Sequence, residues 1–398
     1  FKNTEDNEDN KDVIKEADNI TKKPSVTPFP TKEATKEPEE TEEPVPTEEP
    51  SVVHVVSFGD FLAHMPVINS GKNSDGTLSY EHVFTHVKDD IDNADVAVIN
   101  METIMGGADL GYSTFPRFNS PQEIGVTLCD MGFDVILHAS NHVLDKGDKA
   151  VATTLDFWSN YTDRLSVIGI HSSEEDAKKI TVVESNGIKI ATLNYTYGLN
   201  GFSMDRDKQW RVDMLIDKTK IADDIERAKE LADVVIVFPH WGTEYSHKVS
   251  SFQKDWTEFF AKHGVDVVVG AHPHVIEPVE WVESKVNGED HKMLVYYSLG
   301  NFVSYQLEAA RMLELEASFD IVRDEDGNVT IEDAKAIPLV CHFNSPVNKD
   351  NLTVYKLEEY TSQLASIHNV NKTQTQGPLT LDGLKQKCRD VLGDWYEE

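Results

Sequence analysis

Five short runs rich in Val and Ile in this chain end in polar residues of the kinds that bind metal ions. The runs with their polar ends span residues 55–60, 96–102, 135–142, 235–240 and 267–274. Continuous apolar runs of this kind are typical of buried strands, and ligands of open α/β sheets bind just beyond the carboxyl ends of strands. We therefore predict an α/β fold that carries a metal site, with two ions, at one edge of its strands.

The charge of the chain limits the partners that it can bind. Its 398 residues include 37 Lys and Arg against 70 Asp and Glu, which gives a formal net charge of −33. Binding to nucleic acid or to anionic lipid depends on basic side chains, so we expect no nucleic-acid partner and no electrostatic adhesion to lipid. The cysteines Cys129, Cys341 and Cys388 lack metal-ligand spacing, and we expect isolated apolar thiols.

Residues 1–50 differ in composition from the rest of the chain. Pro, Thr, Lys and Glu dominate this segment, and aliphatic residues are sparse. It cannot bury enough apolar area to offset the entropy lost on ordering, which predicts a disordered acidic tether. The tether fits an extracellular, membrane-associated protein at the cell surface; a tail without a role is the alternative. The chain starts at Phe1 without an initiator Met, so we expect its N-terminal signal or anchor to be missing.

Strand and helix patterns alternate from Val52 onward, which predicts one α/β domain over residues 51–345. Strands are expected at 52–58, 95–100, 134–138, 188–195, 233–239, 265–270 and 293–298, and helices near 80–93, 121–131, 147–160, 217–231 and 251–263. Residues 312–340 alternate with period two around a turn at 324–328, which predicts an antiparallel hairpin. Residues 346–398 form a polar C-terminal extension with two amphipathic helices, near 353–367 and 380–396. These helices either pack on the domain or form an appendage.

The polar residues at the first three strand ends suit metal binding and acid–base chemistry. Asp60 follows Gly59, and the carboxylate of Glu102 is placed to bridge two cations. Asn141 supplies a neutral carbonyl ligand, while the imidazole of His142 can meet a substrate oxygen. Asp145, three residues later, can hold that imidazole and raise its basicity.

The last two strand ends supply imidazoles. His240 ends one run, and His272 and His274 follow another at a spacing of two residues. Imidazole and carboxylate ligands without Cys suit Zn, Mn or Fe and disfavour a structural zinc site. Two further residues have open alternatives: Glu244 either orients His240 or is a surface acid, and Arg117 either clamps an anionic substrate or forms a structural salt bridge.

These motifs, taken with their order, resemble one known family. The motifs are Gly59-Asp60, Asn100-Met-Glu102, Ser140-Asn141-His142-Val-Leu-Asp145-Lys-Gly147, His240-Trp-Gly-Thr-Glu244-Tyr, Gly270-Ala-His272-Pro-His274 and Tyr297-Ser-Leu-Gly300-Asn301-Phe302. Over residues 52–345 the chain resembles the CapA family of poly-γ-glutamate capsule biosynthesis proteins, which are related to calcineurin-like metallophosphoesterases. The resemblance implies a four-layer α-β-β-α sandwich of the metallophosphatase type with two divalent metal ions at the strand ends.

The resemblance also implies roles for the strand-end residues. Asp60 and His274 would hold one metal, Asn141, His240 and His272 the other, and Glu102 would bridge them. His142 would be the general acid or an electrostatic clamp beside the scissile bond. The chain departs from the broader phosphoesterase pattern in two ways: Asp-x-His is absent at the first strand, where His64 follows Asp60 only four residues on, and Glu102 replaces the usual bridging Asp.

Two hypotheses about function follow from the resemblance. In the first, the protein is a metal-dependent hydrolase or transferase that acts on a phosphoester or on an anionic γ-glutamyl polymer, with membrane components of a capsule synthase as further partners. In the second, it is a non-catalytic factor for capsule assembly or export that retains the fold. A surface adhesion module is a third reading, supported only by the tether.

Overall fold

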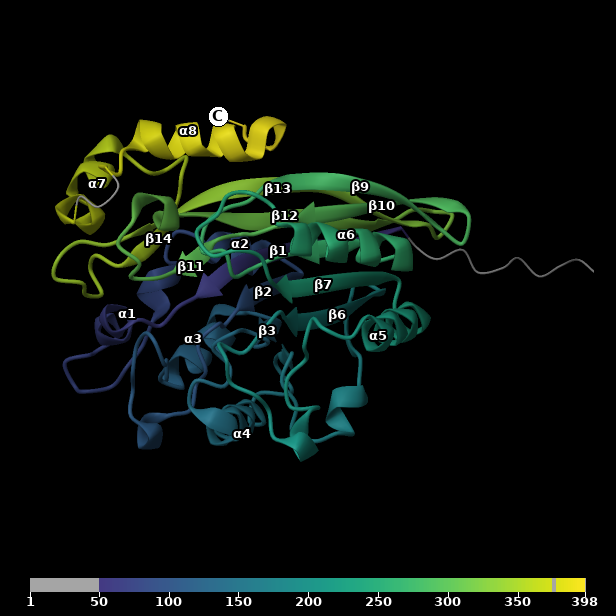
Figure 1. Ribbon diagram of the computed structural model, residues 1–398. Coiled ribbons are helices and arrows are strands. Elements are labelled where there is room, and N and C mark those ends of the chain that lie inside the picture. Colours follow the sequence, from purple (N-terminus) through teal and green to yellow (C-terminus); the bar gives the residue numbers. More distant parts are fainter. Residues whose placement is uncertain (1–49, 374–376, 398) are drawn as a thin grey trace, which may run out of the picture. The chain divides into compact units, whose positions relative to one another are not determined.

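Two β-sheets form the centre of the molecule, for which a computed structural model describes residues 50–373 and 377–397 (Figure 1). These residues belong to a compact unit that spans Thr47–Glu398. The tether predicted for residues 1–50 lies, apart from Pro50, outside the described residues.

Each sheet contains a parallel segment that carries part of the predicted site. The first has the strand order β14 (Thr353–Lys356), β13 (Val329–His342), β12 (Leu313–Arg323), β1 (Ser51–Phe61), β2 (Val96–Asn100), β3 (Val135–Leu137) and β4 (Ser166–Ile168), with β11 (Asn301–Val303) beside the end of β1. The second has the order β5 (Thr181–Ser185), β6 (Ile188–Thr196), β7 (Val234–His240), β8 (Val267–Val269), β10 (Glu289–Tyr296) and β9 (Val279–Val286). Strands β1–β4 are parallel to one another, and so are β6, β7, β8 and β10.

Strand β7 shows why the strands read as continuous apolar runs. Val234, Ile236 and Phe238 belong to the core between the two sheets. Val235 and Val237, on the other face of the strand, pack in a second core with the helices α5 and α6. Because both faces are buried, every position of the strand before His240 is apolar.

Helices cover the outer faces of both sheets. They are α1 (Met65–Ser70), α2 (Lys88–Asn93), α3 (Glu123–Met131), α4 (Gly147–Trp158), α5 (Lys218–Leu231), α6 (Ser251–His263), α7 (Ser362–Ile367) and α8 (Leu381–Leu392). Helices α5 and α6 lie against the second sheet, and α2 contacts β1 and α3 on the first (Figure 1). The predicted α/β fold with four layers, α-β-β-α, is confirmed.

Two hairpins join the second sheet's edge strands to their neighbours, and neither was predicted. Asn186 and Gly187 connect β5 to β6, and Asn287 and Gly288 connect β9 to β10, all four with positive φ. Consecutive positive φ values are typical of the two-residue turns that Asn-Gly favours, so the dipeptides were the available signal. The hairpin predicted over residues 312–340 is confirmed as β12 and β13.

The C-terminal extension contributes to the sheet as well as to the helices. The helix predicted over 353–367 is wrong at its start, because Thr353–Lys356 pairs with β13 as strand β14 and the helix α7 begins only at Ser362. Helix α8 packs on the domain through its buried residues Leu384, Cys388 and Leu392. All three cysteines are buried and unpaired. Within the part of the chain that the structure describes, no helix is long and apolar enough to cross a membrane.

Candidate metal centre

The polar ends of five strands meet at one edge of the two sheets. Strands β1, β2 and β3 bring three of the side chains from the first sheet, and β7 and β8 bring the others from the second. The six predicted ligands are at most 2% exposed, although all are polar: Asp60, Glu102, Asn141, His240, His272 and His274. Burying so many polar side chains is unfavourable unless each has a polar partner. We therefore expect this edge to bind a polar or charged ligand.

The contacts divide four of the ligands into two groups with Glu102 between them. In the first group, Asp60 Oδ2 lies 3.1 Å from His274 Nδ1. In the second group, His240 Nε2 lies 2.9 Å from Asn141 Oδ1. The Glu102 carboxylate lies 3.7 Å from His240 Nε2 and 3.8 Å from His274 Nδ1, so one side chain faces both groups.

Several ligand atoms in this cluster are buried without a hydrogen-bond partner. Both oxygens of Glu102 and the Nδ1 atom of His272 are in this state. Ligand atoms of Glu102, His272 and His274 all lie within 4.8 Å of one another, which is close enough for all three to contact one ion. A divalent cation would satisfy these atoms, so the residues present fit a metal site.

Burial sets the protonation preferences of the cluster. It raises the pKa of Glu102 well above its usual value, and the nearby carboxylates of Asp60 and Glu244 raise it further. Burial also lowers the pKa values of His240 and His272, with smaller contributions from the neighbouring imidazoles. Neutral imidazoles are the form that binds a metal, and a cation beside Glu102 would favour its ionised form.

The turn that carries the last two imidazoles has a strained backbone. His272 has φ of 99° and His274 has φ of 60°, in the region that favours glycine. Such conformations cost about 1–3 kcal/mol each and persist only where surrounding structure holds them. The turn begins at Gly270, where a Cβ atom would lie 2.0 Å from the backbone oxygen of Tyr297. The close approach explains the glycine and fixes where the turn leaves β8.

Three asparagine side chains orient the predicted ligands. Asn100 donates from Nδ2 to Asp60 Oδ1 at 2.6 Å, and the same atom lies 3.3 Å from His240 Nδ1. Asn301 Nδ2 donates to the backbone oxygen of His274 at 3.4 Å. The sequence prediction assigned no orienting role to either, although Asn100 stands two residues before Glu102 and Asn301 follows a glycine in a quoted motif.

The third asparagine, Asn200, had no signal in the sequence. Its Oδ1 atom accepts from Asn141 Nδ2 at 3.2 Å, and its Nδ2 atom lies 3.3 Å from His142 Nδ1. Tyr197 also reaches the site, where its ring centroid lies 4.5 Å from that of His272. Both residues reach the site from the loop that follows β6, and only the tertiary fold brings them there.

The structure places Asp145 against His142, the predicted general acid. His142 Nδ1 lies 2.7 Å from Asp145 Oδ2, which also accepts from the backbone N–H of Phe118 at 2.7 Å. The Phe118 ring meets His142 edge-on with 4.8 Å between ring centroids. A buried carboxylate and an aromatic ring therefore fix the orientation of this imidazole.

Other candidates lie at the rim of the site. Arg117 is exposed, and its guanidinium stacks over Phe202 at 5.0 Å from the ring centroid. Glu244 is also exposed, and within the described residues the ring nitrogens of His240 face Asn100 and Asn141 instead. His64 lies close to the site, because its ring meets the Phe118 ring edge-on with 5.2 Å between centroids, and Phe118 also contacts His142. Burial lowers the pKa of His64 to about 4.

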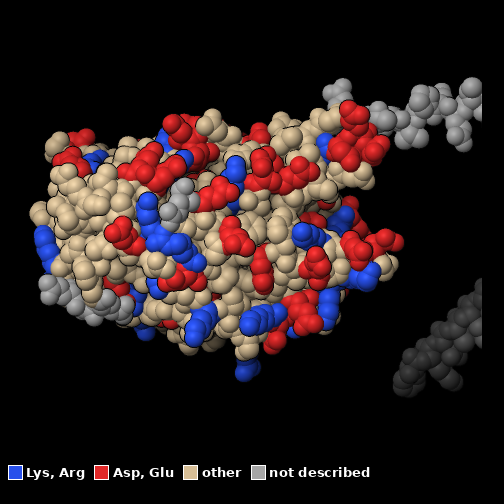
Figure 2. Space-filling view, turned by 90° about the horizontal axis from the view of Figure 1, so that it is seen from above, with Lys and Arg blue, Asp and Glu red and all other residues tan. Residues whose placement is uncertain are grey.

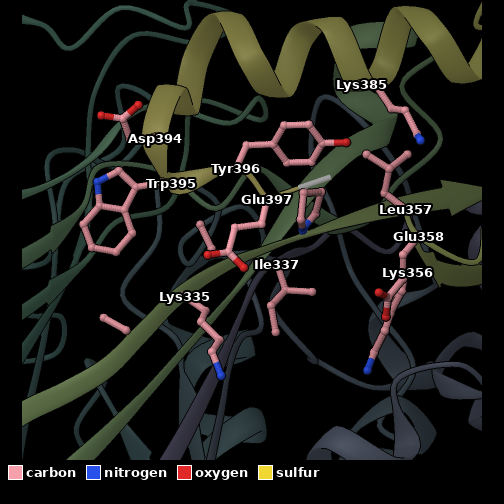
Figure 3. Close-up of a pocket in the computed structure, with 13 residues that line it drawn as sticks. Lys335, Ile337, Lys356, Leu357, Glu358, Lys385, Asp394, Trp395, Tyr396 and Glu397 are labelled. Carbon is pink, nitrogen blue, oxygen red and sulfur yellow. The ribbon is translucent and has the colours of Figure 1, made fainter.

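A separate cavity of about 450 Å³ lies away from these ligands, between β13, β14 and the C-terminal residues 394–397 (Figure 3). Its lining includes Lys335, Lys356 and Trp395 but none of the strand-end residues. The candidate site therefore rests on ligand chemistry at the strand ends and not on the size of a cavity.

Comparisons with known proteins agree with the motifs. The model of the family described as bacterial capsule synthesis protein PGA_cap matches residues 54–306. The chain is 30% identical over 258 residues to the PGA biosynthesis protein CapA of Bacillus subtilis (strain 168), which covers 64% of this chain and 63% of that protein. It is 27% identical over 232 residues to the capsule biosynthesis protein CapA of Bacillus anthracis, with 56% and 54% covered.

The chain thus spans less than two thirds of the length of these two curated relatives. Among solved structures, that of Haemophilus influenzae NAD nucleotidase is similar with a TM-score of 0.44 and 13% identity. That similarity covers 86% of this chain and 67% of the other.

Proposed function

Because the chain belongs to the family of bacterial capsule synthesis proteins, we propose that it acts in the production of poly-γ-glutamate or a related capsule polymer as a divalent-metal-dependent hydrolase or transferase. The observation that carries the proposal is the Glu102 carboxylate, buried without a partner between two groups of ligands. Glu314 also has two buried oxygens without a partner, but Glu102 alone of the two faces the imidazoles of both His240 and His274, where bound cations would satisfy its oxygens.

In this proposal the ligands hold two ions of Mn, Zn or Fe. Asp60 and His274 hold one, and Asn141, His240 and His272 hold the other. Glu102 faces both groups and bridges. When bound, such a pair of ions polarises the bond to be cleaved and activates water. Asn100 keeps Asp60 in place through its 2.6 Å hydrogen bond.

His142 is the proposed general acid, or an electrostatic clamp, beside the scissile bond. As an imidazolium, His142 would donate from Nδ1–H to Asp145 Oδ2 and from Nε2–H to a substrate oxygen, which is the form that a general acid requires. The substrate is a phosphoester or a γ-glutamyl polymer. Figure 2 shows groups of Asp and Glu side chains on one face, with Lys and Arg between them. The formal net charge of −33 repels a polyanion, and cations bound at the site would offset that repulsion. Arg117 is one such cation at the rim.

A second candidate function is a non-catalytic factor for polymer assembly or export. It is favoured by the residue two positions after Asp60, where the broader phosphoesterase pattern has a histidine. Here that residue is Leu62, which is buried and cannot bind a metal. In either function we propose a site of action at the cell surface, with membrane components of a capsule synthase as partners.

The variant His142→Ala distinguishes the two functions. Asn160→Ala serves as the control, because Asn160 is an exposed residue of the turn after α4. If the protein is an enzyme, we expect His142→Ala to lower turnover of phosphoesters or γ-glutamyl oligomers about 10²- to 10⁴-fold while bound metal is unchanged. Capsule formation in cells would fall in parallel. An assembly factor would instead keep capsule formation in the variant, and the enzyme proposal would then be wrong for this residue.

A further inference from the structure

A second arginine, Arg311, is connected through Asn301 to the turn that carries His272 and His274. It lies in the 3₁₀ turn Ala309–Met312, between β11 and β12. The side-chain Nδ2 atom of Asn301 lies 3.1 Å from the backbone oxygen of Arg311 and 3.4 Å from that of His274, and it also lies 3.2 Å from Gln306 Oε1 and 3.3 Å from Ser304 Oγ. One buried side chain therefore contacts both this segment and a predicted ligand.

An aromatic ring separates the guanidinium of Arg311 from the imidazole of His274. The guanidinium carbon lies 3.5 Å from the ring centroid of Tyr245, a close cation–π contact. The Tyr245 ring in turn lies 5.9 Å from the ring of His274. Tyr245 is 43% exposed and has φ of 66°, so its backbone is held in an uncommon conformation at the rim of the site.

The hydrogen-bonding capacity of this guanidinium is only partly used. One terminal nitrogen pairs with Glu308 at 3.0 Å, three residues away along the chain. Local ion pairs of this kind, with both side chains partly exposed, are worth at most about 1 kcal/mol. The Nε atom is buried and has no partner. A buried N–H without an acceptor is unfavourable, and an oxyanion that contacts the Nε edge would satisfy it.

We infer that Arg311 binds an oxyanion of the substrate, a carboxylate or a phosphate group, beside the His274 side of the metal centre. Guanidinium forms paired hydrogen bonds with both kinds of oxyanion, and stacking on Tyr245 fixes the plane in which they form. The incoming group takes the place of Glu308. The inference rests on the proposed function, because it names the chemical class of the substrate of that same site.

Arg117 is the competing candidate for this role, and its surroundings differ. It is exposed and stacks on Phe202 in a loop. Its guanidinium forms no hydrogen bond or ion pair with the described residues. Arg311 is instead 17% exposed in its side chain and fastened to the ligand turn. We therefore expect the larger loss of binding from the change at Arg311.

The test is isothermal titration calorimetry on the full chain loaded with Mn²⁺, using three probes. They are a γ-glutamyl tetramer with free α-carboxylates, the same tetramer with α-carboxamides, and inorganic phosphate. We expect Arg311→Gln to weaken binding of the carboxylate tetramer or of phosphate by about tenfold to a hundredfold. Which probe is affected identifies the oxyanion, and the carboxamide tetramer should not respond to the change if the group is a carboxylate.

Two further variants separate the role of Arg311 from an effect on folding. Arg164→Gln is the matched control, because Arg164 forms an exposed ion pair with Asp130 and precedes β4 at the opposite end of the strands. It should bind all probes as the unchanged protein does. Arg311→Lys keeps the charge without the paired donors and should show a smaller loss than Arg311→Gln, with an unchanged melting temperature.

The inference is overturned if Arg311→Gln binds the carboxylate tetramer and phosphate as tightly as the unchanged protein, or if the unchanged protein binds neither. Its failure is distinct from failure of the proposed function. Binding that depends on Arg311 in a protein without turnover would refute the enzyme and keep the inference. If Arg311→Gln changes neither turnover nor binding, the inference about Arg311 is wrong and the enzyme proposal stands.

Discussion

Replacing Glu102 by Gln should have opposite effects on stability with and without metal. In the metal-free protein, the variant puts a neutral amide in place of a buried carboxylate that has no partner and whose charged form burial disfavours. Unsatisfied buried groups of this kind cost about 1–3 kcal/mol. We therefore expect Glu102→Gln to stabilise the metal-free protein at pH 8 by about that amount, which raises the melting temperature by about 2–6 °C.

The pH dependence of this effect follows from the pKa of Glu102. Burial and Asp60 raise this pKa in the folded protein, so the folded state keeps a proton that the unfolded state releases above its own pKa of about 4.3. The stability of the metal-free protein then falls as the pH rises between the unfolded and the folded pKa. The gain from Glu102→Gln should be small at pH 5 and larger at pH 8.

Added Mn²⁺ should reverse the sign of the change in stability that Glu102→Gln causes. An ion at one hundred times its dissociation constant stabilises the folded protein by about 2.7 kcal/mol, provided that the site can hold it. The amide of Gln lacks the charge that a bridging ligand needs, so the variant should gain less than the unchanged protein. With saturating Mn²⁺ the variant should melt at a lower temperature than the unchanged protein.

The assay is thermal unfolding at pH 5 and pH 8, with and without Mn²⁺, with Glu316→Gln as the matched control. Glu316 is also a buried carboxylate, and burial raises its pKa to about 8, but its neighbours are Asp90 and Lys356. Its variant should gain stability at pH 8 whether or not Mn²⁺ is present. The reasoning is refuted if Glu102→Gln lowers the stability of the metal-free protein at pH 8, or if Mn²⁺ stabilises it as much as the unchanged protein.

Two further predictions concern residues that hold the ligands in place. Gly270→Ala should destabilise the protein by about 1–3 kcal/mol in chemical unfolding, because a Cβ atom would meet the Tyr297 carbonyl oxygen at 2.0 Å, whereas Gly198→Ala, with no atom within 4 Å of its added Cβ, should be close to neutral. Asn100→Ala removes the donor to Asp60 Oδ1 and should weaken Mn²⁺ affinity about tenfold to a hundredfold in calorimetry; unchanged affinity would show that this hydrogen bond does not orient a ligand.

Strands with both faces buried were predictable, and so was the alternating hairpin of β12 and β13, but the edge strands β9 and β4 were not. β7 and β8 bury every residue and read as apolar runs, so their ends and the polar residues beyond them could be placed from the sequence. β9 mixes Glu, Lys and Ser into its exposed positions at the sheet edge, and β4 is three residues long. Neither sequence can be distinguished from that of a loop by its pattern of apolar residues, although the Asn-Gly turns were a usable signal.

The residues of the candidate site also fall into those that the sequence could place and those that it could not. Parallel strands of one sheet end at the same edge, so the sequence could place Asp60 with Glu102 on the first sheet and His240 with His272 on the second. Asn200 and Arg311 reach the site from loops, and no local pattern marks them. Their contacts depend on how β6 and β11 sit in the finished sheets, which the sequence pattern does not specify.

The most direct test of the central claim is the metal content of the purified protein by elemental analysis. The unchanged protein should hold about two equivalents of Mn, Zn or Fe, and an Asp60→Ala/His240→Ala variant should lose them. His86→Ala, a change at a histidine paired with Glu359 away from the strand ends, should leave the content as it is. No metal in the unchanged protein after incubation with Mn²⁺ or Zn²⁺, or full metal content in the double variant, would contradict the account.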